Sequence, residues 1–326
     1  MPALEIGIDL GTRNVLVYTS QRGIVLKEPS LVAYDKDSDK IIAYGEEARQ
    51  ILGKNNAGLM AIRPIRRGAI ADYPATEKMM KYFIAKAIGR RAFRKPRISI
   101  CIPGNTTEVE RLAVEEAAYQ AGAREVFLVN SPLAAAIGMG IDVLRPSGNM
   151  IVDIGAGSTD LAILSMGDVV VSRSIKVGGD NFNEMIMRHI RREYQLFIGE
   201  DTAETIKIRI GTVWEDGGIA PMEIKGRNCI TGLPGLVTLE AEEIRRAMQE
   251  PMTQILDAIR SILEQTPPEL AADIVDRGII LTGGGASLNG LEDLVEAKTG
   301  VNTLVSQDPT LSVVVGTGKY ARIFGR

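Results

Sequence analysis

One stretch constrains this chain more than any other: Met150–Leu164, with the sequence MIVDIGAGSTDLAIL. An apolar run leads into Asp153, the glycine-rich turn Gly155–Thr159 follows, and Asp160 precedes a second apolar run. Two apolar runs joined by a glycine turn predict a β-hairpin. Glycine lets backbone N–H groups approach a phosphate without a Cβ in the way, and acids on both sides suit a divalent metal ion. Glycine turns also occur where a chain simply reverses direction, so this stretch alone leaves both interpretations open.

The N-terminus carries the same pattern. In Glu5–Tyr18, an apolar run reaches Asp9, the turn Gly11–Asn14 follows, and a second apolar run begins at Val15. Two copies of one hairpin indicate two similar domains that face each other across a cleft and bind the same ligand. The alternative is that two unrelated hairpins merely look alike.

A third glycine turn lies near the C-terminus, in Arg277–Asn289 (RGIILTGGGASLN). An apolar strand leads into three glycines, Gly283 to Gly285, and a helix is expected from Leu288. Three glycines directly after a buried strand indicate that a flat or anionic group approaches the backbone. A helix N-terminus close behind would add partial positive charge to such a site.

Composition narrows the class of protein. The chain has 326 residues, 45% of them hydrophobic and 24% charged, as in a globular protein of about two domains. A net charge of −3 and few aromatic residues give no reason to expect nucleic acid as a partner. The single histidine, His189, rules out a histidine-based metal site. The two cysteines, Cys101 and Cys229, form no CxxC pair, which fits a reducing cytosol.

The segments around the glycine turns alternate between strand and helix. Ile98–Pro103 and Val126–Val129 have the character of buried strands, and Thr107–Glu110 is a capping box that opens a helix between them. Apolar residues at helical spacing predict a further helix over Thr76–Ile88. This alternation predicts an α/β fold. Neither a GxxxxGK[ST] P-loop nor an N-terminal Rossmann GxGxxG is present, so the nucleotide folds with those motifs are excluded.

A membrane-spanning helix is not expected, because no apolar run approaches the ~20 residues that it needs. No signal peptide is expected either, since a strand with acidic residues begins almost at once. We therefore expect a cytoplasmic protein, at most attached to a membrane surface. The basic loop Gly89–Arg97 suits an anionic membrane surface, with Phe93, Arg94 and Lys95 as the contact residues. Its alternative is a solvated loop whose phenylalanine packs into the core.

Three stretches, IGIDLGTRN, IVDIGAGSTD and IILTGGGASLNG, occur in the order of the two phosphate loops and the adenosine loop of actins, heat-shock chaperones and sugar kinases, and resemble them. Further stretches, among them IRPIRRGAIADY, VERLAVEEAAYQAGAREVFLV, PLAAAIGMG and LFIGEDTAETIK, resemble the rod-shape-determining bacterial actins of the MreB family, including its Mbl and MreBH relatives. The resemblance covers essentially the whole chain without large insertions.

The resemblance implies an actin-like ATPase fold of the α/β class, with two similar α/β domains around a nucleotide cleft and a smaller subdomain inserted in each. Domain I would comprise residues 1–145 and 315–326, with an inserted lobe at about 31–66. Domain II would comprise residues 146–314, with an inserted lobe at about 178–249.

The resemblance also implies an ATP-dependent protein that polymerises with itself into filaments, with protofilaments expected in pairs. Such filaments would lie on the anionic inner surface of the cell membrane and help to determine cell shape by organising the cell-wall elongation machinery. ATP and Mg²⁺ would be the cofactors, and hydrolysis of ATP to ADP and phosphate would be coupled to polymerisation.

Carried over position by position, the resemblance assigns roles to individual residues. Asp9 and Asp153 would hold the magnesium ion through water. Asp160 and Thr159 are catalytic candidates, with Asp160 at the acidic position near the attacking water. The nucleotide-binding residues would come from the two phosphate loops, a helix beside the nucleoside and the adenosine loop: Gly11, Thr12, Arg13, Asn14, Gly155, Gly157, Ser158, Thr159, Glu204, Lys207, Gly283, Gly284, Gly285 and Ala286.

The chain departs from the family pattern where water is handled. The family usually has Glu-Glu-Pro where this chain has Asn130-Ser131-Pro132, and the residue before the proline is expected to orient or activate the attacking water. Ser131, the third catalytic candidate, is neutral and a poor general base. Arg13 replaces a small residue of the first phosphate loop, and either adds charge at the phosphates or points to solvent. We expect ATP binding to survive these changes and hydrolysis to be slow or impaired.

Two other functions are compatible with the same fold. A small-molecule kinase would need a catalytic aspartate in a sugar-binding loop of the first domain, and Pro103–Thr106 offers none. A chaperone-type ATPase would need a peptide-binding domain, for which a chain ending at Arg326 leaves no room. The filament-forming protein is therefore the expected function, with these two as alternatives.

Overall fold

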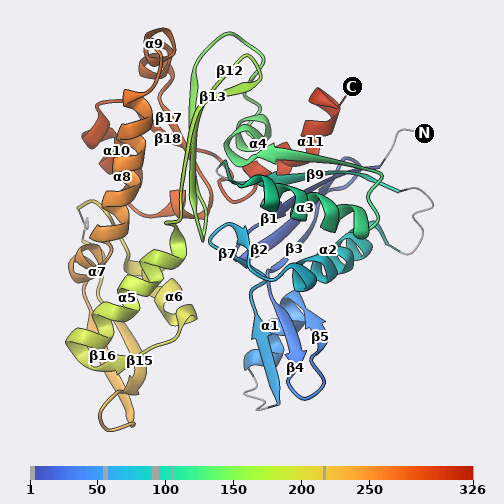
Figure 1. Cartoon of the computed structure of the whole chain (residues 1–326). Helices are drawn as coiled ribbons and strands as arrows, with labels where there is room; N and C mark the ends of the chain where they lie inside the picture. Colours follow the sequence, from blue (N-terminus) through green and yellow to red (C-terminus); the bar gives the residue numbers. More distant parts are fainter. Residues whose placement is uncertain (1–3, 54–57, 90–94, 105, 216–217, 326) are drawn as a thin grey trace.

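The computed structural model describes residues 4–53, 58–89, 95–104, 106–215 and 218–325. Two five-stranded sheets lie at its centre (Figure 1). The strands of the first sheet, in order across it, are β10 (Glu125–Asn130), β9 (Arg97–Ile102), β1 (Glu5–Leu10), β2 (Asn14–Thr19) and β3 (Gly23–Pro29). Those of the second are β18 (Thr303–Val305), β17 (Ile279–Thr282), β11 (Asn149–Ile154), β12 (Thr159–Ser165) and β13 (Asp168–Ile175).

The two sheets repeat one design. In each, the central strand pairs antiparallel with the next strand of the chain and parallel with a much later one. Asp9 lies in β1 opposite Cys101 of β9, and Asp153 lies in β11 opposite Thr282 of β17. Both expected hairpins and the α/β class are therefore confirmed, and the two acids occupy equivalent places in the two sheets.

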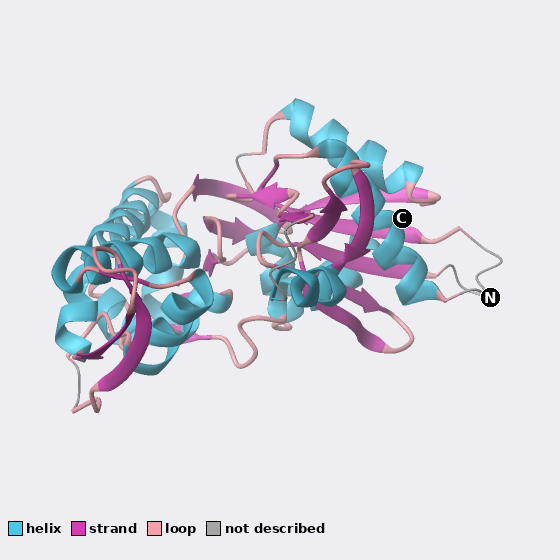
Figure 2. Ribbon diagram, turned by 90° about the horizontal axis from the view of Figure 1, so that it is seen from below, coloured by secondary structure: helices cyan, strands magenta, loops and turns pink. Residues whose placement is uncertain are grey.

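Helices flank both sheets, as Figure 2 shows for the two halves of the molecule side by side. They are α1 (Gly45–Gly53), α2 (Tyr73–Ile88), α3 (Glu108–Gln120), α4 (Ser131–Gly138), α5 (Gly179–Tyr194), α6 (Glu200–Ile210), α7 (Ala241–Ala247), α8 (Gln249–Glu264), α9 (Pro268–Arg277), α10 (Leu291–Thr299) and α11 (Ser312–Phe324), with a 3₁₀ turn at Gly284–Ser287.

Local sequence explains where two predicted helices begin. The helix expected from Thr76 starts three residues earlier, because the carboxylate of Asp72 accepts the N–H of Ala75 at 2.9 Å and caps the helix there. In α3 the predicted capping box is present: Thr107 and Glu110 exchange hydrogen bonds between side chain and backbone.

Smaller sheets extend each half. Three strands, β4 (Val32–Asp35), β5 (Lys40–Tyr44) and β6 (Leu59–Ile62), form a sheet beside α1, within the lobe expected at about 31–66. Another three, β14 (Leu196–Phe197), β15 (Met222–Asn228) and β16 (Pro234–Leu239), lie within the lobe expected at about 178–249. A two-strand hairpin, β7 (Ile65–Arg66) and β8 (Ala69–Ile70), follows the first lobe.

Side-chain alternation along β1 explains how the first sheet is covered. Ile6 and Ile8 join the apolar cluster that includes residues of α2 and α3. Gly7, between them, faces the opposite side, where a Cβ would lie 2.2 Å from the backbone nitrogen of Gly318 in α11. The C-terminal helix therefore packs on the first sheet, as Figure 1 shows with α11 in red beside β9.

Helices α4 and α11 cross each other at very short range. A Cβ on Gly316 of α11 would lie 1.6 Å from the carbonyl oxygen of Ala134, and one on Gly138 of α4 would lie 1.8 Å from that of Ser312. Helix α4 follows the first sheet in the chain but contacts β11 and β12 of the second, whereas α11 follows the second sheet but contacts β1 and β9 of the first. Each half of the molecule therefore receives a helix from the other.

Candidate functional site

The two hairpin turns and the third glycine turn meet at one cavity of about 510 Å³, a size that suits a small-molecule ligand. Sixteen of the predicted site residues line it: Asp9, Gly11, Thr12, Arg13, Asn14, Ser131, Asp153, Gly155, Gly157, Ser158, Asp160, Glu204, Lys207, Gly283, Gly284 and Gly285. Two larger hollows, of about 1010 and 1000 Å³, lie along α7 and α8 and contain none of the predicted site residues.

Two predicted residues do not reach the cavity wall. Thr159 is fully buried, and its hydroxyl donates to the carbonyl oxygen of Val177 at 2.8 Å. Ala286 is 2% exposed and belongs to the apolar core. Both residues hold the chain in place behind the cavity, and the roles assigned to them stay predictions.

The two phosphate-loop candidates lie against each other. A Cβ on Gly157 in the second turn would lie 2.4 Å from Oγ1 of Thr12 in the first, so only glycine permits this contact. Oγ1 of Thr12 also accepts the backbone N–H of Gly68 at 3.0 Å. The short hairpin β7–β8, whose Gly68 lines the cavity, is thus joined to the first loop.

The N-terminus of α5 supports the second loop. The N–H of Gly179 donates to the carbonyl of Gly155 at 3.0 Å, and the N–H of Asp180 donates to that of Ala156 at 2.8 Å. These N–H groups of a first helical turn, which have no partner within the helix, therefore fix the loop backbone.

The third turn differs from its prediction in one respect. The helix expected from Leu288 begins at Leu291, after the 3₁₀ turn, so no α-helix N-terminus directly follows the glycines. Gly283 has φ +80°, and its Cβ would lie 2.4 Å from Oδ1 of Asp153, so this position requires glycine. At Gly284 a Cβ would meet open space, which leaves bare backbone facing the cavity.

Three aspartates gather at one part of the cavity. Asp153 and Asp160 are buried and Asp9 is partly buried; no ion pair to any of them occurs within the described residues. Burial raises the pKa of Asp9 to about 6, with the Cys101 thiol opposing the shift by hydrogen bonding. Burial also raises the pKa of Asp153 well above its ordinary value, and the negative charges of Asp160 and Asp9 add to this rise.

These carboxylates suit a hard cation. Among the residues that the structure describes, no three acids, cysteines or histidines lie close enough to hold a metal ion by themselves. A cation held partly through water fits the donor set better, because carboxylate oxygens and water are the ligands that Mg²⁺ prefers. Its charge would also offset the cost of ionising three neighbouring acids with raised pKa values.

Asp160 is held in place from both halves of the molecule. Its Oδ2 accepts the hydroxyl of Ser158 at 3.0 Å, and its Oδ1 accepts the N–H of Gly104, which follows β9, at 3.1 Å. Burial raises the pKa of Asp160, and these hydrogen bonds oppose the rise. The carboxylate is thus fixed beside the acids that suit a metal ion.

Ser131 is built into the cavity wall. It is 4% exposed, and its hydroxyl donates to the carbonyl oxygen of Ile102 at 3.1 Å. Its Oγ also lies 2.9 Å from Sγ of Cys101. A hydroxyl engaged in this way is poorly placed to accept a proton from water.

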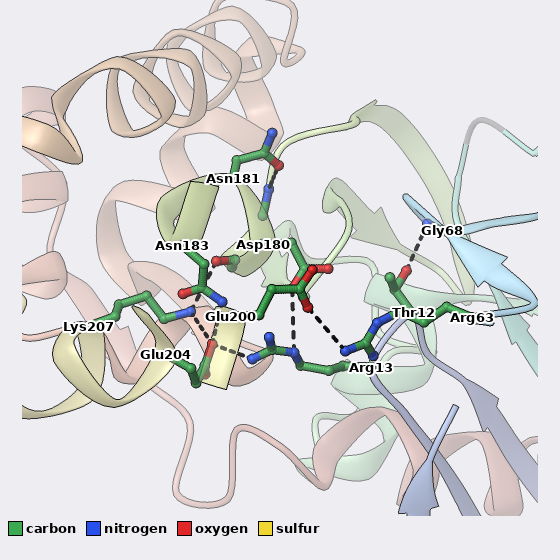
Figure 3. A network of polar contacts seen from close by, with 12 residues as sticks. Thr12, Arg13, Arg63, Gly68, Asp180, Asn181, Asn183, Glu200, Glu204 and Lys207 are labelled. Carbon is green, nitrogen blue, oxygen red and sulfur yellow. Dashed lines mark hydrogen bonds and ion pairs between the residues drawn. The ribbon is translucent and has the colours of Figure 1, made fainter. Parts of the chain in front are cut away.

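Arg13 lines the cavity and is engaged by carboxylates of the second half, and the phosphate role assigned to it stays a prediction. Its guanidinium forms ion pairs with Glu204 of α6 and, at 3.4 Å, with Asp180 of α5 (Figure 3). A second arginine of the first half, Arg63, pairs with Glu200 at 3.5 Å. We call these contacts the cross-cleft ion pairs, because they join the first phosphate loop and the first lobe to the second half.

Glu204 is the centre of this network. Its Oε2 accepts hydrogen bonds from Asn183 at 2.7 Å and Lys207 at 2.8 Å besides that from Arg13. Burial alone would raise the pKa of Glu204, but Lys207, Asn183 and Arg13 outweigh it and lower the pKa. Burial lowers the pKa of Lys207, and Glu204 opposes that shift. Glu204 is therefore held as a carboxylate.

Sequence reasoning missed other residues of the cavity, among them Gly68, Cys101, Asp180 and Phe182. Asp180 follows two glycines after a strand, a signal of the same kind as the other turns. Gly68 ends the basic segment Arg63–Gly68, in which no local signal indicates a cavity residue. Cys101 lies in the buried strand expected at Ile98–Pro103, and its parallel pairing with Asp9 brings it to the cavity.

Only one of the three residues predicted to contact a membrane lies within the described residues. Phe93 and Arg94 lie outside the described residues, and Lys95 is exposed. Over the described part of the chain, no helix combines the length and apolar character needed to cross a membrane.

Comparison with known proteins supports one assignment over the whole chain. The family model for MreB/Mbl protein matches residues 3–325. The cell shape-determining protein Mbl of Bacillus subtilis (strain 168) is 50% identical over 318 residues, which are 98% of this chain and 96% of that protein. The cell shape-determining protein MreB of Escherichia coli (strain K12) is 46% identical over 321 residues, 97% of this chain and 92% of that protein.

Among solved structures, MreB5 of Spiroplasma citri bound to ADP matches with a TM-score of 0.92 and 37% identity, over 98% of this chain and 96% of that chain. The actin-like fold implied by the sequence resemblance is therefore confirmed. The chain belongs to the MreB/Mbl family of cell shape-determining proteins.

Proposed function

We propose that this chain is an ATP-binding, actin-like cytoskeletal protein that polymerises into membrane-associated filaments and helps to determine cell shape. The observation that carries the proposal is the cavity, which is lined by two equivalent glycine turns, each preceded by an aspartate, and by a third glycine turn. Relatives that match nearly the full chain are named cell shape-determining proteins, and the structurally similar MreB5 of Spiroplasma citri was solved with ADP.

The cavity has the groups that a magnesium nucleotide needs. Backbone N–H groups of Gly11–Asn14 and Gly155–Thr159 bind the phosphates. Asp9 and Asp153 hold Mg²⁺ through water, and the bound ion neutralises phosphate charge. The bare backbone at Gly284 receives the adenosine. Two carboxylates without a cationic partner in the described structure support the metal assignment.

We infer slow hydrolysis from the position of Ser131. The serine hydroxyl is hydrogen-bonded within the wall, whereas a carboxylate at this position would project an acceptor toward the cavity. Asp160 remains as the acid nearest to the attacking water. Loss of a water-orienting group costs orders of magnitude in phosphoryl transfer.

Self-assembly is supported by apolar residues at opposite ends of the second half. Ile230 and Leu233, in the loop between β15 and β16, are 74% and 65% exposed. Val275 of α9 and Leu304 of β18 are also exposed, and Figure 1 places α9 and β15 at opposite ends of this half. Two different patches that meet head to tail generate a filament rather than a closed dimer.

The filament is proposed to lie on the anionic inner membrane surface and to organise the cell-wall elongation machinery. Exposed Lys95, next to Phe93 and Arg94 in the sequence, would supply the contact. Flotation of the Phe93→Ala variant with anionic vesicles tests this attachment. We expect reduced binding, and undiminished flotation would refute the role of the loop.

Sedimentation with ATP and Mg²⁺ tests polymerisation. We expect the full chain to pellet above a threshold concentration. The Leu233→Glu variant should bind ATP but stay in the supernatant, whereas Asp153→Asn should lose Mg²⁺-dependent ATP binding. A chain that binds ATP yet stays soluble at every concentration would count against the filament.

Phosphate release under polymerising conditions tests the role of Ser131. Ser131→Glu should raise turnover, and Ser131→Gln, which has the same length without a carboxylate, should not. Wild-type turnover equal to that of a relative with an intact Glu-Glu-Pro would refute the inference of slow hydrolysis.

A further inference from the structure

Arg67 occupies an unusual place beside the phosphate loops. Together with Gly68 it forms the two-residue turn between β7 and β8. Both residues have positive φ, +50° for Arg67 and +75° for Gly68, as a two-residue hairpin turn of type I′ requires. An arginine rarely adopts this conformation, so the residue type at this position is not explained by the turn itself.

The turn touches both phosphate loops. The N–H of Gly68 donates to Thr12 of the first loop at 3.0 Å. A Cβ on Gly157 of the second loop would lie 2.8 Å from Cα of Arg67, and one on Gly68 would lie 3.1 Å from Oγ of Ser158. The backbone of Arg67 thus lies directly against the tip of the second loop, and its long side chain starts there.

No described residue compensates the charge of Arg67. Arg13 and Arg63 are neutralised by the acids of the cross-cleft ion pairs. Arg67 is exposed and has no hydrogen bond or ion pair with any residue that the structure describes. Arg66 beside it is also exposed, but of the two only Arg67 has its backbone against the second phosphate loop, so its charge is the one placed to meet an anion there.

The place of Arg67 along the cavity determines which part of a bound nucleotide its positive charge would meet. The tip of the second phosphate loop, at Gly157 and Ser158, leads to Asp160. The third glycine turn, which is assigned to the adenosine, lies against Ile154 at the other end of this loop. A group beside the tip is thus remote from the nucleoside and close to the distal end of the phosphate chain.

We propose that Arg67 binds the phosphate group distal to the diphosphate, either as the terminal phosphate of ATP or as free phosphate retained beside ADP. This inference rests on the proposed nucleotide function. A guanidinium forms short, charge-assisted hydrogen bonds with phosphate oxygens. Arg67 therefore makes the cavity prefer a triphosphate over a diphosphate without contributing to diphosphate binding.

The decisive variant is Arg67→Gly, because glycine adopts a φ of +50° without strain and the turn keeps its shape. Arg66→Ala is the matched control: it removes the same charge one residue away, from a strand residue paired with Ala69 rather than placed against the loops. Calorimetric titration with Mg-AMPPNP and with Mg-ADP gives the ratio of the two affinities for each full-length protein.

We expect Arg67→Gly to lower the preference for AMPPNP over ADP by about tenfold, the loss of one charge-assisted contact, with ADP affinity unchanged. Arg66→Ala should leave the ratio as in the wild type, and Arg67→Lys should retain part of it. An unchanged ratio in Arg67→Gly, or an equal fall in Arg66→Ala, would overturn the assignment. A wild type that binds neither nucleotide would instead refute the proposed function.

Inorganic phosphate distinguishes the two sources of the group. If free phosphate uses the site, it should strengthen ADP binding to the wild type but not to Arg67→Gly. If inorganic phosphate strengthens ADP binding equally in the wild type and in Arg67→Gly, free phosphate binds elsewhere. That result would count against a site at Arg67 shared by free phosphate and the terminal phosphate of ATP.

Discussion

Removing the side chain of Arg13 should weaken the link between the two halves of the molecule by an amount that can be worked from its contacts. Arg13 is 20% exposed, and its partners Asp180 and Glu204 are 37% and 28% exposed. Exposed ion pairs contribute about 0–1 kcal/mol, whereas leaving a buried charge without its partner costs about 3–5 kcal/mol. In Arg13→Ala, Glu204 keeps Lys207 and Asn183, so Asp180 bears most of the loss. We expect the free energy of unfolding to fall by about 2 kcal/mol.

Urea unfolding of the full chain measures this loss. Arg145→Ala is the control, since it breaks an exposed ion pair with Asp142 (2.9 Å) and should cost less than about 0.5 kcal/mol. A double-mutant cycle with Asp180→Asn should give a coupling energy of about 1 kcal/mol that shrinks as salt is added. Additive effects of Arg13→Ala and Asp180→Asn, or a cost no larger than that of Arg145→Ala, would refute the cross-cleft ion pairs as a stabilising link.

Two further predictions concern the core and the second lobe. Gly316→Ala would place a Cβ 1.6 Å from the carbonyl of Ala134, so thermal unfolding should show a loss of about 3 kcal/mol, while Gly58→Ala, which meets open space, should change little. Burial would raise the pKa of Glu243, but His189 and other hydrogen-bond donors outweigh burial and lower it. The charge of Glu243 therefore stabilises the fold above pH 4.5, and this stabilisation is lost as the pH falls below that value. Glu243→Gln should therefore be less stable than the wild type at neutral pH, with the difference shrinking below pH 4.5; a difference independent of pH would contradict this.

The repeated hairpins were predictable because their information is local. Strand, acid and glycine turn follow one another within about fifteen residues, and an apolar run on each side of the turn indicates the two strands. The capping box of α3 is predictable for the same reason, since Thr107 and Glu110 are three residues apart.

The environment of Arg13 could not be predicted in this way. Its partner Glu204 is 191 residues away in the sequence, and only the packing of the two halves brings them together. The sequence therefore suggested solvent or phosphate as the partner of Arg13, whereas the structure places two carboxylates there. The same limit applies to Ser131 and Cys101, which meet only because β9 and β10 are adjacent strands.

The third glycine turn shows a limit of a different kind. The sequence from Leu288 suggests the start of a helix, but the chain first makes a 3₁₀ turn. It does so because Gly283 and Gly285 must lie against Asp153 and Ile154. Tertiary contacts thus move the helix by three residues, which no local signal records.

The crossing of α4 and α11 has a consequence for how the molecule is made. A fragment that ends near Gly140 would carry the first sheet without α11, so the face of β1 that presents Gly7 would be left bare. The complementary fragment would carry the second sheet without α4, and Ile151 would lose its apolar cover. Neither fragment should be a stable protein when synthesised alone, yet the two synthesised together should reassociate without a peptide bond between them. The chain is therefore a natural candidate for fragment complementation, with its break point in the loop after Gly140.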